Sequence, residues 1–437
     1  MKKGVVGVLV LLALVVLVSP AIVGRLAEKS MDENLNWAAQ ESGDITVTSE
    51  HFTRGWFSSE GTHRVELQDG DLKTMVMTLG EPGDELPVLI INTKLDHGLI
   101  PVSSMSRERG SLAPGLGSAV STLQVELAGG ETIDVPGIIY SKVGLGGELV
   151  SNYVLEPGSL TEDDTTASWG STDITLETNP TSGRAVFHGV VSSLSVGDGA
   201  EAVSVGSLSF AGNQAPTEFG IAVGDFDFEL EGLAVTVNGG AAAGMRSMAV
   251  NATIELDGDD VNVNATAGMT TQDIPQFGEM SFDMSLELDG ADAELLGRVQ
   301  QTLESMGPTQ DPMTAYAAVE GDLLAMFAAG FELNFERFDL TLPQGTVTSR
   351  MLFSFAERDP ADFVWTSLLM STEATIDLAI PEALVEMLLQ VQPAAAMAIG
   401  GGYLVKSGDA YEMAAEMKKG LLTVNGAPIP IPLGQMR

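Results

Sequence analysis

Histidines, serines and carboxylates are the side chains of this sequence that could carry out chemistry, and none stands in a known catalytic pattern. The four histidines are never two to five residues apart: His51, His63, His97 and His188. This spacing does not indicate a local zinc site. The sequence has no G-x-S-x-G elbow, no H-E-x-x-H pair, no G-x-x-x-x-G-K-[ST] loop and no G-x-G-x-x-G turn after a strand. We therefore predict no catalytic residue, no metal and no cofactor, although a triad of distant Ser, His and Asp residues would leave no such pattern.

Asp96, His97 and Gly98, followed by Pro101, form the polar cluster of most interest. Asp, Gly and Pro are the ordinary turn formers, so we predict a strand that ends in a turn, with Asp96 able to bond nearby backbone amides. The functional alternative combines His51 with Asp96 and His97 in one polar site. Base rates favour the turn, and His97 is the first residue to substitute if the cluster is functional.

Arg54, Trp56 and Phe57 surround Gly55 in a segment that otherwise alternates like a strand. Two large aromatic residues after a glycine suit a β-bulge, where an aromatic side chain packs at a point of close backbone approach. We therefore treat Arg54, Trp56 and Phe57 as speculative functional positions.

Acidic residues occupy every second position from Asp225 to Glu231 and alternate with apolar residues such as Phe226 and Phe228. In a strand the acids would line one face, while the aromatics would enter the core. Such a face could bind Ca²⁺ through carboxylate oxygens. We favour a solvated surface, because acids are abundant throughout the chain and the acidic turn 257–260 lacks the ligand spacing of a calcium-binding loop.

The chain is strongly acidic, with 21 basic and 60 acidic residues and a formal net charge of −39. This charge repels the phosphates of nucleic acids, so we exclude a nucleic-acid partner. It is typical of salt-adapted proteins, in which concentrated salt screens the self-repulsion, and we interpret it as adaptation rather than as a binding site. The absence of cysteine excludes disulfides, thiol catalysis and thiolate metal sites.

The elements that must position these residues are mainly β-strands, because apolar and polar residues alternate along most of the chain after residue 44. Two hairpins are clear: 252–256 with 261–265, and 331–342 with 347–355. The helical spacing of apolar residues predicts three helices, at 292–306, 312–329 and 382–391. We expect a mainly β protein with some α structure (α+β), in which large, curved antiparallel sheets are interrupted by a few helices. These form either one elongated body or two lobes joined near residue 290.

An apolar N-terminal segment predicts where the protein works. Residues 4–24 follow two lysines and carry no charge, and a helix of that length spans the roughly 30 Å hydrocarbon core of a bilayer. We favour a retained transmembrane anchor over a cleaved signal peptide, whose apolar region is typically about 7 to 15 residues long. The lysines predict that the residues after about 24 lie outside the cytoplasm. The expected organisation is an anchor (1–24), a juxtamembrane stalk or helix (25–43), a β-rich region (44–290), a helical segment (291–330) and a β-rich region with C-terminal helices (331–437).

Three phrases of the sequence, in chain order, resemble the YdgA-like family of bacterial inner-membrane proteins. They are HFTRGWFSS at 51–59, LDHGLIP at 95–101 and KGLLTVNGAPI at 419–429. The resemblance covers nearly the whole chain. It implies an anchor in the bacterial inner membrane, a periplasmic body that can dimerise, and a function that is unsettled, and it brings no catalytic residues. With it, the speculative functional positions are Arg54, Trp56, Phe57, Asp96, His97, Asn425 and Gly426.

Three functions from different classes fit these observations. The first is a non-enzymatic envelope scaffold or binding protein, which would use sheet surfaces or a strand edge to bind other proteins. The second is a lipid-binding or lipid-transfer protein, because a long sheet with one apolar face can form a groove for acyl chains, and 20 methionines can provide an adaptable lining. The third, a periplasmic hydrolase, is disfavoured by the missing motifs. A continuous open apolar surface would favour lipid binding, and a filled core would favour the scaffold.

Overall fold

The structure of this chain is a computed structural model that describes most of the residues between 45 and 430. The gaps within this span are 55–57, 69–72, 74–85, 98–116, 128–129, 145–146, 163–164, 180–181, 199, 239, 273–277, 307–311 and 361–362. The predicted anchor (1–24) and stalk (25–43) lie outside the described residues. Among the residues that are described, no helix is both long enough and apolar enough to cross a bilayer.

Antiparallel strands dominate the described residues, as the sequence predicted, and the chain divides into two compact units. Unit 1 comprises Met1–Ala215 and Ala234–Ala241, and unit 2 comprises Pro216–Leu233 and Ala242–Arg437. Strand β14 (Ala222–Val237) and strand β15 (Gly240–Asp257) each contribute residues to both units. The division therefore falls within this pair of long strands and not near residue 290.

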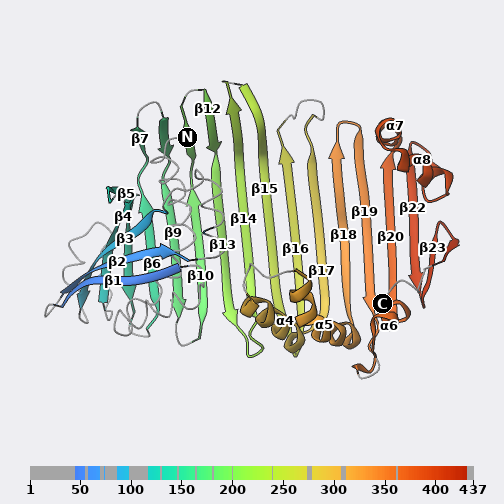
Figure 1. Ribbon diagram of the computed structural model, residues 1–437, viewed down its shortest axis with the longest axis horizontal. Helices are drawn as coiled ribbons and strands as arrows, with labels where there is room; N and C mark the ends of the chain where they lie inside the picture. Colours follow the sequence, from blue (N-terminus) through green and yellow to red (C-terminus); the bar gives the residue numbers. More distant parts are fainter. Residues whose placement is uncertain are drawn as a thin grey trace. The chain divides into compact units, whose positions relative to one another are not determined.

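Unit 1 is built from short to medium-length strands, coloured blue to green in Figure 1. They are β1 (Ile45–Arg54), β2 (Ser58–Leu67), β3 (Val88–His97), β4 (Gly117–Glu126), β5 (Thr132–Val143), β6 (Leu149–Leu155), β7 (Gly158–Glu162), β8 (Thr165–Trp169), β9 (Thr172–Asn179), β10 (Arg184–Val191), β11 (Leu194–Gly197), β12 (Glu201–Val205) and β13 (Ser207–Pro216). One antiparallel ladder runs β1–β2–β3–β4–β5–β6–β9–β10–β13. A second runs β7–β8–β11–β12 and ends on β14.

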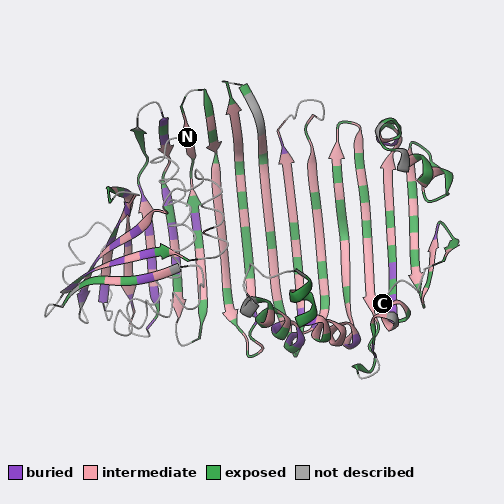
Figure 2. Cartoon of the chain, in the orientation of Figure 1, coloured by how far each residue is buried: buried purple, intermediate pink, exposed green. Residues whose placement is uncertain are grey.

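A filled hydrophobic core lies inside unit 1. Every second residue of its central strands points inward, because successive side chains of a strand alternate between the two faces. Leu123, Val125 and Tyr153 are only 2%, 1% and 2% exposed, and they pack with Val47, Ile91 and other apolar residues from β1 to β6 and β9. Figure 2 shows this concentration of buried residues. Strands β1 to β6 and β9 of unit 1 therefore bury their apolar faces against one another.

Unit 2 is built from longer strands, coloured yellow-green to red in Figure 1. After β15 they are β16 (Asp260–Thr271), β17 (Ser281–Asp292), β18 (Phe331–Leu342), β19 (Gly345–Phe355), β20 (Thr372–Pro381), β21 (Val405–Ser407), β22 (Ala410–Lys418), β23 (Leu421–Val424) and β24 (Ala427–Ile429). The ladder runs β15–β16–β17–β18–β19–β20–β22–β23–β24, with β21 paired to β22. Both predicted hairpins are present, as β15–β16 and β18–β19.

Five helices accompany the strands of unit 2 among the described residues. They are α4 (Ala293–Met306), α5 (Pro312–Ala329), α6 (Trp365–Ser371), α7 (Glu382–Val391) and α8 (Pro393–Gly400). The three predicted helices correspond to α4, α5 and α7, and the Asp292 carboxylate accepts the Leu295 N–H at 2.8 Å to cap the start of α4. The periodicity predicted neither α6 nor α8, because seven and eight residues are too few to reveal it.

These helices cover the two ends of the unit 2 sheet and leave its middle free. Helices α4 and α5 connect β17 to β18 and pack over the strand ends around Val261, Ala291 and Phe331. Helix α5 also places Phe327 against Phe331 and Phe355, with ring centroids 5.5 and 4.9 Å apart. Helices α7 and α8 follow the far end of β20, so they lie at the opposite ends of the strands (Figure 1). Within the described ranges, no helix lies over the middle of these strands (Figure 1).

Candidate functional site: an open apolar sheet face

The candidate site is one face of the unit 2 sheet, which we call the apolar face. It arises because each long strand places its apolar residues at alternate positions, and all of these positions point the same way. Its residues are Met248, Val250 and Ala252 on β15; Ala265, Ala267 and Met269 on β16; Phe282, Met284 and Leu286 on β17; Phe335, Phe338 and Leu340 on β18; Val347 and Met351 on β19; Ile376 and Leu378 on β20; and Met413 and Ala415 on β22.

Strand register joins these residues into continuous rows across the sheet. One row runs through the directly paired residues Val250, Ala267, Met284 and Phe338. The neighbouring row runs through Met248, Met269, Phe282, Leu340 and Val347. A bulge in β18 adds one residue between Phe335 and Phe338. Both side chains therefore still lie on the apolar face, where they pair with Leu286 and Met284 of β17.

No second layer of described residues covers the apolar face, and its side chains are accessible to solvent. Phe338 and Leu340 are 41% and 40% exposed, and the other members of the face are half-buried (Figure 2). Phe282 and Phe338 contact each other edge to face, with centroids 5.2 Å apart, so the aromatic rings pack within the layer. Sheets in folded domains normally bury their apolar face against another layer. This face therefore has the composition of a core without a second layer of described residues over its middle.

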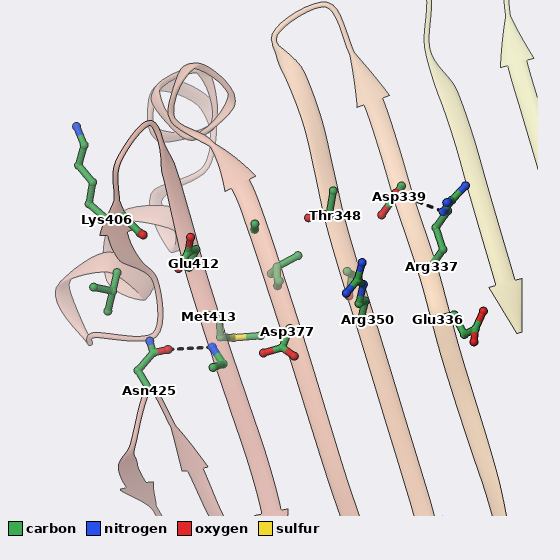
Figure 3. Close-up of a pocket in the computed structure, with 16 residues that line it drawn as sticks. Glu336, Arg337, Asp339, Thr348, Arg350, Asp377, Lys406, Glu412, Met413 and Asn425 are labelled. Carbon is green, nitrogen blue, oxygen red and sulfur yellow. Dashed lines mark hydrogen bonds and ion pairs between the residues drawn. The ribbon is translucent and has the colours of Figure 1, made fainter. Parts of the chain in front are cut away.

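The opposite face of the same sheet is polar and carries a shallow hollow of about 880 Å³, shown in Figure 3. Arg337 Nε lies 3.9 Å from Asp339 Oδ2, and Arg350 stands on the neighbouring strand, directly paired in register with Asp377. Within the described part of the chain Arg350 makes no hydrogen bond or ion pair. The hollow is wide and exposed, so water screens its charges and the arrangement does not resemble a catalytic pocket.

The predicted cluster around Asp96 is only partly described. Asp96 lies within β3, 3% exposed, and pairs in register with Ser58 and Ser118. It is therefore a buried strand residue and not a turn residue, because the ladder continues to His97, the last residue of β3. The side chain of His97 and the turn that follows lie outside the described residues.

His51 does not join this cluster. It is exposed on β1, where its Nε2 lies 2.9 Å from the Thr53 hydroxyl, and its register partner on β2 is Thr62. Thr62 pairs in turn with Asn92, four residues and about 13 Å along β3 from Asp96. The strand register thus separates His51 from Asp96 instead of building one polar site.

Two further sequence-predicted sites have an ordinary structural setting or fall outside the described residues. Arg54 is the last residue of β1, and its side chain and all of Trp56 and Phe57 lie outside the described residues.

The acids at 225–231 are exposed on β14, as expected for a solvated face. The prediction that the intervening aromatics enter a core is wrong for Phe226, which is 36% exposed. The described residues contain no cluster of acids and histidines that could hold a metal ion.

Asn425 and Gly426 form the two-residue turn between β23 and β24. Both have positive φ angles, 50° and 77°, which Asn and Gly adopt most readily. The Asn425 Oδ1 accepts the Ala414 N–H at 2.9 Å (Figure 3), and its Nδ2 donates to the carbonyl oxygens of Gly402 and Tyr403 at 2.9 and 3.1 Å. Asn425 therefore fastens the loop after α8 to β22, which is a structural role.

Several buried polar groups in unit 1 are bonded in pairs across strands. The Thr93 and Ser121 hydroxyls lie 2.8 Å apart, and the Tyr153 hydroxyl donates to the Pro136 carbonyl at 2.9 Å. His63, which is fully buried, places Nδ1 3.0 Å from the Ser49 hydroxyl. Burial raises the pKa of the Tyr153 phenol above its ordinary value of 10. These groups stabilise the core of unit 1 through hydrogen bonds between neighbouring strands.

Sequence reasoning raised an apolar sheet face as a groove for acyl chains, but it did not identify the residues that form the face. The alternation predicted an apolar face, but alternation alone cannot show whether a second layer covers it.

No curated protein and no solved structure matches the chain. A family profile described as "Bacterial protein of unknown function (DUF945)" matches residues 1–432. The chain with the open apolar sheet face therefore belongs to the DUF945 family of bacterial proteins of unknown function.

Proposed function

We propose that this protein is a non-enzymatic lipid-binding protein and that the apolar face of unit 2 holds the acyl chains of the lipid. The single observation that carries the proposal is the open apolar face, in which Phe338 and Leu340 are 41% and 40% exposed. An acyl chain needs no hydrogen-bond partner, and each methylene group that is fully removed from water contributes about 0.8 kcal/mol. The face offers apolar contacts over rows of paired strands.

The dimensions of the apolar face suit acyl chains. From Phe282 to Leu286 the face extends four residues, or about 13 Å, along the strands. One leaflet of a bilayer contributes about 15 Å of the roughly 30 Å hydrocarbon core, so a single acyl chain has a similar length. The seven strands from β15 to β20 and β22 span about 30 Å at roughly 4.8 Å per strand, which leaves room for several chains.

The lining of the apolar face supports an adaptable ligand. Met248, Met269, Met284, Met351 and Met413 belong to it, and unbranched thioether side chains adjust to irregular ligands. Alanines on β15, β16 and β22 lie between these larger side chains and leave shallow spaces at the surface.

A second copy of the chain is a less favourable occupant of the apolar face, because each copy carries a formal net charge of −39.

The envelope location is also part of this proposal. We propose that residues 4–24 anchor the chain in the bacterial inner membrane and that the body lies in the periplasm, as in the YdgA-like resemblance. An anchor would hold the apolar face close to a source of lipid. Protease protection in intact and permeabilised cells tests the location, because a body outside the cytoplasm becomes accessible once the outer barrier is removed.

Photo-crosslinking tests the apolar face directly. The full chain, purified in mild detergent, is incubated with a palmitic acid analogue that carries a diazirine in its chain, and the labelled peptides are identified by mass spectrometry. We expect labelling on β17, β18 and β19, and we expect the double variant F338E/L340E to lose most of it. Phe338 and Leu340 are 41% and 40% exposed and lie outside the buried clusters, so these substitutions should leave the fold intact.

A matched control separates lipid binding from general charge effects. Thr348→Glu adds a carboxylate to the polar face of β19, next to Val347 on the apolar face, and should leave the labelling unchanged. Labelling that is confined to residues 4–24, or that survives F338E/L340E, would contradict the proposal. Crosslinks between two copies through β18 would instead support a scaffold or dimer.

A further inference from the structure

A second apolar surface lies at the far end of the unit 2 strands, on a part of the chain that carries no charge. From Met387 to Val405 there is no acidic or basic residue, although charged residues make up 19% of the whole chain. This segment includes the end of α7, all of α8, the loop at 401–404 and the start of β21. It follows β20 at the end of the strands opposite α4 and α5 (Figure 1).

Large apolar side chains in this segment point to solvent. Met397 on α8 is 70% exposed, and Leu389 and Tyr403 are 40% and 41% exposed. We call these three residues the α8 surface. The inner side of α7 is already occupied, because Leu384 and Val385 are 6% and 1% exposed and form its contact with the sheet. The α8 surface is therefore additional to the apolar residues that the fold needs.

The backbone of the loop after α8 is satisfied internally. The N–H groups of Gly401, Gly402, Tyr403 and Leu404 donate to carbonyls of α8 at 2.8 to 3.2 Å. The carbonyls of Gly402 and Tyr403 accept the Asn425 side-chain amide. These bonds are those of an ordinary helix C-cap. They pair the backbone donors of the loop, which lowers the cost of placing it in an apolar medium.

One charge at the border of the segment is paired, because Lys406, directly after it, forms an ion pair with Glu382 at the start of α7. Glu386 on α7 and Asp409 and Glu412 beyond β21 are exposed acids at the border of the segment. In a chain of net charge −39, a surface formed by a segment without charged residues can approach a low-dielectric phase at a smaller electrostatic cost than the acidic surface around it.

We infer that the α8 surface docks on a phospholipid bilayer and inserts Met397 and Leu389 at the boundary between headgroups and acyl chains. Helices with exposed apolar side chains lie at this depth, and tyrosine is enriched there. Basic residues normally strengthen such binding, and their absence here means that docking depends on apolar insertion. This docking goes beyond the proposed lipid binding and does not depend on it, because different residues form the two surfaces.

Site-specific fluorescence tests the docking, and the lack of cysteine in the chain makes each label unique. Met397→Cys in the full chain is labelled with an environment-sensitive NBD fluorophore and mixed with phosphatidylcholine vesicles. The vesicle-bound fraction is then compared with vesicles whose acyl chains carry bromine. We expect a blue-shifted emission that brominated chains quench. Met313→Cys on α5 is the matched control, because Met313 is also 70% exposed but lies at the opposite strand end, and its label should remain unquenched.

Two further measurements distinguish docking from attachment through residues 4–24. The substitutions L389E and Y403E should remove the quenching at position 397 while the chain stays bound to vesicles. Replacing part of the phosphatidylcholine by phosphatidylglycerol should reduce the quenching at low salt and not at high salt, because the acidic chain is repelled by anionic lipid. A label at 397 that stays exposed to water, or equal quenching at 313 and 397, overturns the inference. So does a label at 397 that becomes buried without vesicles, since that indicates a protein partner.

Discussion

Substitution of Asn425 tests whether one side chain fixes the loop after α8 to the unit 2 sheet. Asn425→Ala removes three hydrogen bonds, one from the Ala414 N–H and two to the carbonyls of Gly402 and Tyr403. Each contributes roughly 0.5–1.5 kcal/mol net. Alanine also carries a penalty of about 1–2 kcal/mol at a φ of 50°. Water can replace the lost bonds at this exposed turn, so we expect the low end of the sum, about 2–3 kcal/mol.

Hydrogen exchange followed by mass spectrometry measures this loss locally. A destabilisation of 2–3 kcal/mol corresponds to roughly 30- to 150-fold faster exchange of the amides in the loop 401–404 and at Ala414, when exchange follows local opening. Amides in unit 1 should not change, because Asn425 contacts only residues of unit 2. A global unfolding curve is less informative, since a chain with two compact units need not unfold in one step.

Two companion variants separate the contributions of backbone and side chain at position 425. Asn425→Gly adopts the positive φ without strain, so it should lose only the hydrogen bonds. Its loss of stability should be about 1–2 kcal/mol smaller than that of the alanine variant. Asn425→Asp keeps the acceptor for the Ala414 N–H but turns a carboxylate toward the carbonyls of Gly402 and Tyr403, so it should exchange faster than the glycine variant. Unchanged exchange in Asn425→Ala, or equal effects of Ala and Gly, would refute the reasoning.

Two more predictions concern unit 1. Tyr153→Phe leaves a buried carbonyl without its donor and should cost about 1–3 kcal/mol in urea unfolding at pH 7. Burial holds the pKa of the Tyr153 phenol above 10, so the folded state loses stability as the pH rises above 10, and the phenylalanine variant should lose this dependence; an equal slope in both chains would contradict it. The Arg64 guanidinium donates to Glu126 at 2.7 and 3.3 Å and lowers the pKa of that carboxyl below its ordinary 4.5. The stability that this pair contributes is present above pH 4.5 and is lost as the pH falls. Glu126→Gln should therefore reduce the fall in the midpoint temperature of thermal unfolding between pH 6 and 3. The same fall in the variant as in the wild type would rule out this contribution.

Much of the fold could be predicted from the sequence because its signals are local. The period-two alternation at 252–256 and 261–265 places Ile254 and Leu256 on one face, and the structure pairs them with Val263 and Val261. The helix at 292–306 was equally visible, because its apolar residues recur at helical spacing along one face. Asn425 and Gly426, selected through the family resemblance, fall in a turn whose positive φ angles favour these two residue types.

The candidate site depended on relationships between distant residues that no local pattern encodes. Phe282 and Phe338 are far apart in sequence, and only the register of β17 against β18 brings their rings to 5.2 Å. The buried environment of Asp96 is likewise set by its neighbours on β2 and β4 and not by the turn-forming residues beside it.

The sequence by itself determined the acidic charge, the absence of thiol chemistry, the antiparallel strands and the longer helices, because composition and side-chain periodicity are properties of the chain alone. It also showed that the strands of unit 2 have one apolar side. Only the tertiary structure decided that no second layer of described residues covers this side, while strands β1 to β6 and β9 of unit 1 enclose theirs around Leu123 and Val125. The physical reason is that burial depends on which elements pack together in three dimensions, and the same alternation fits a filled core and an open binding face equally well.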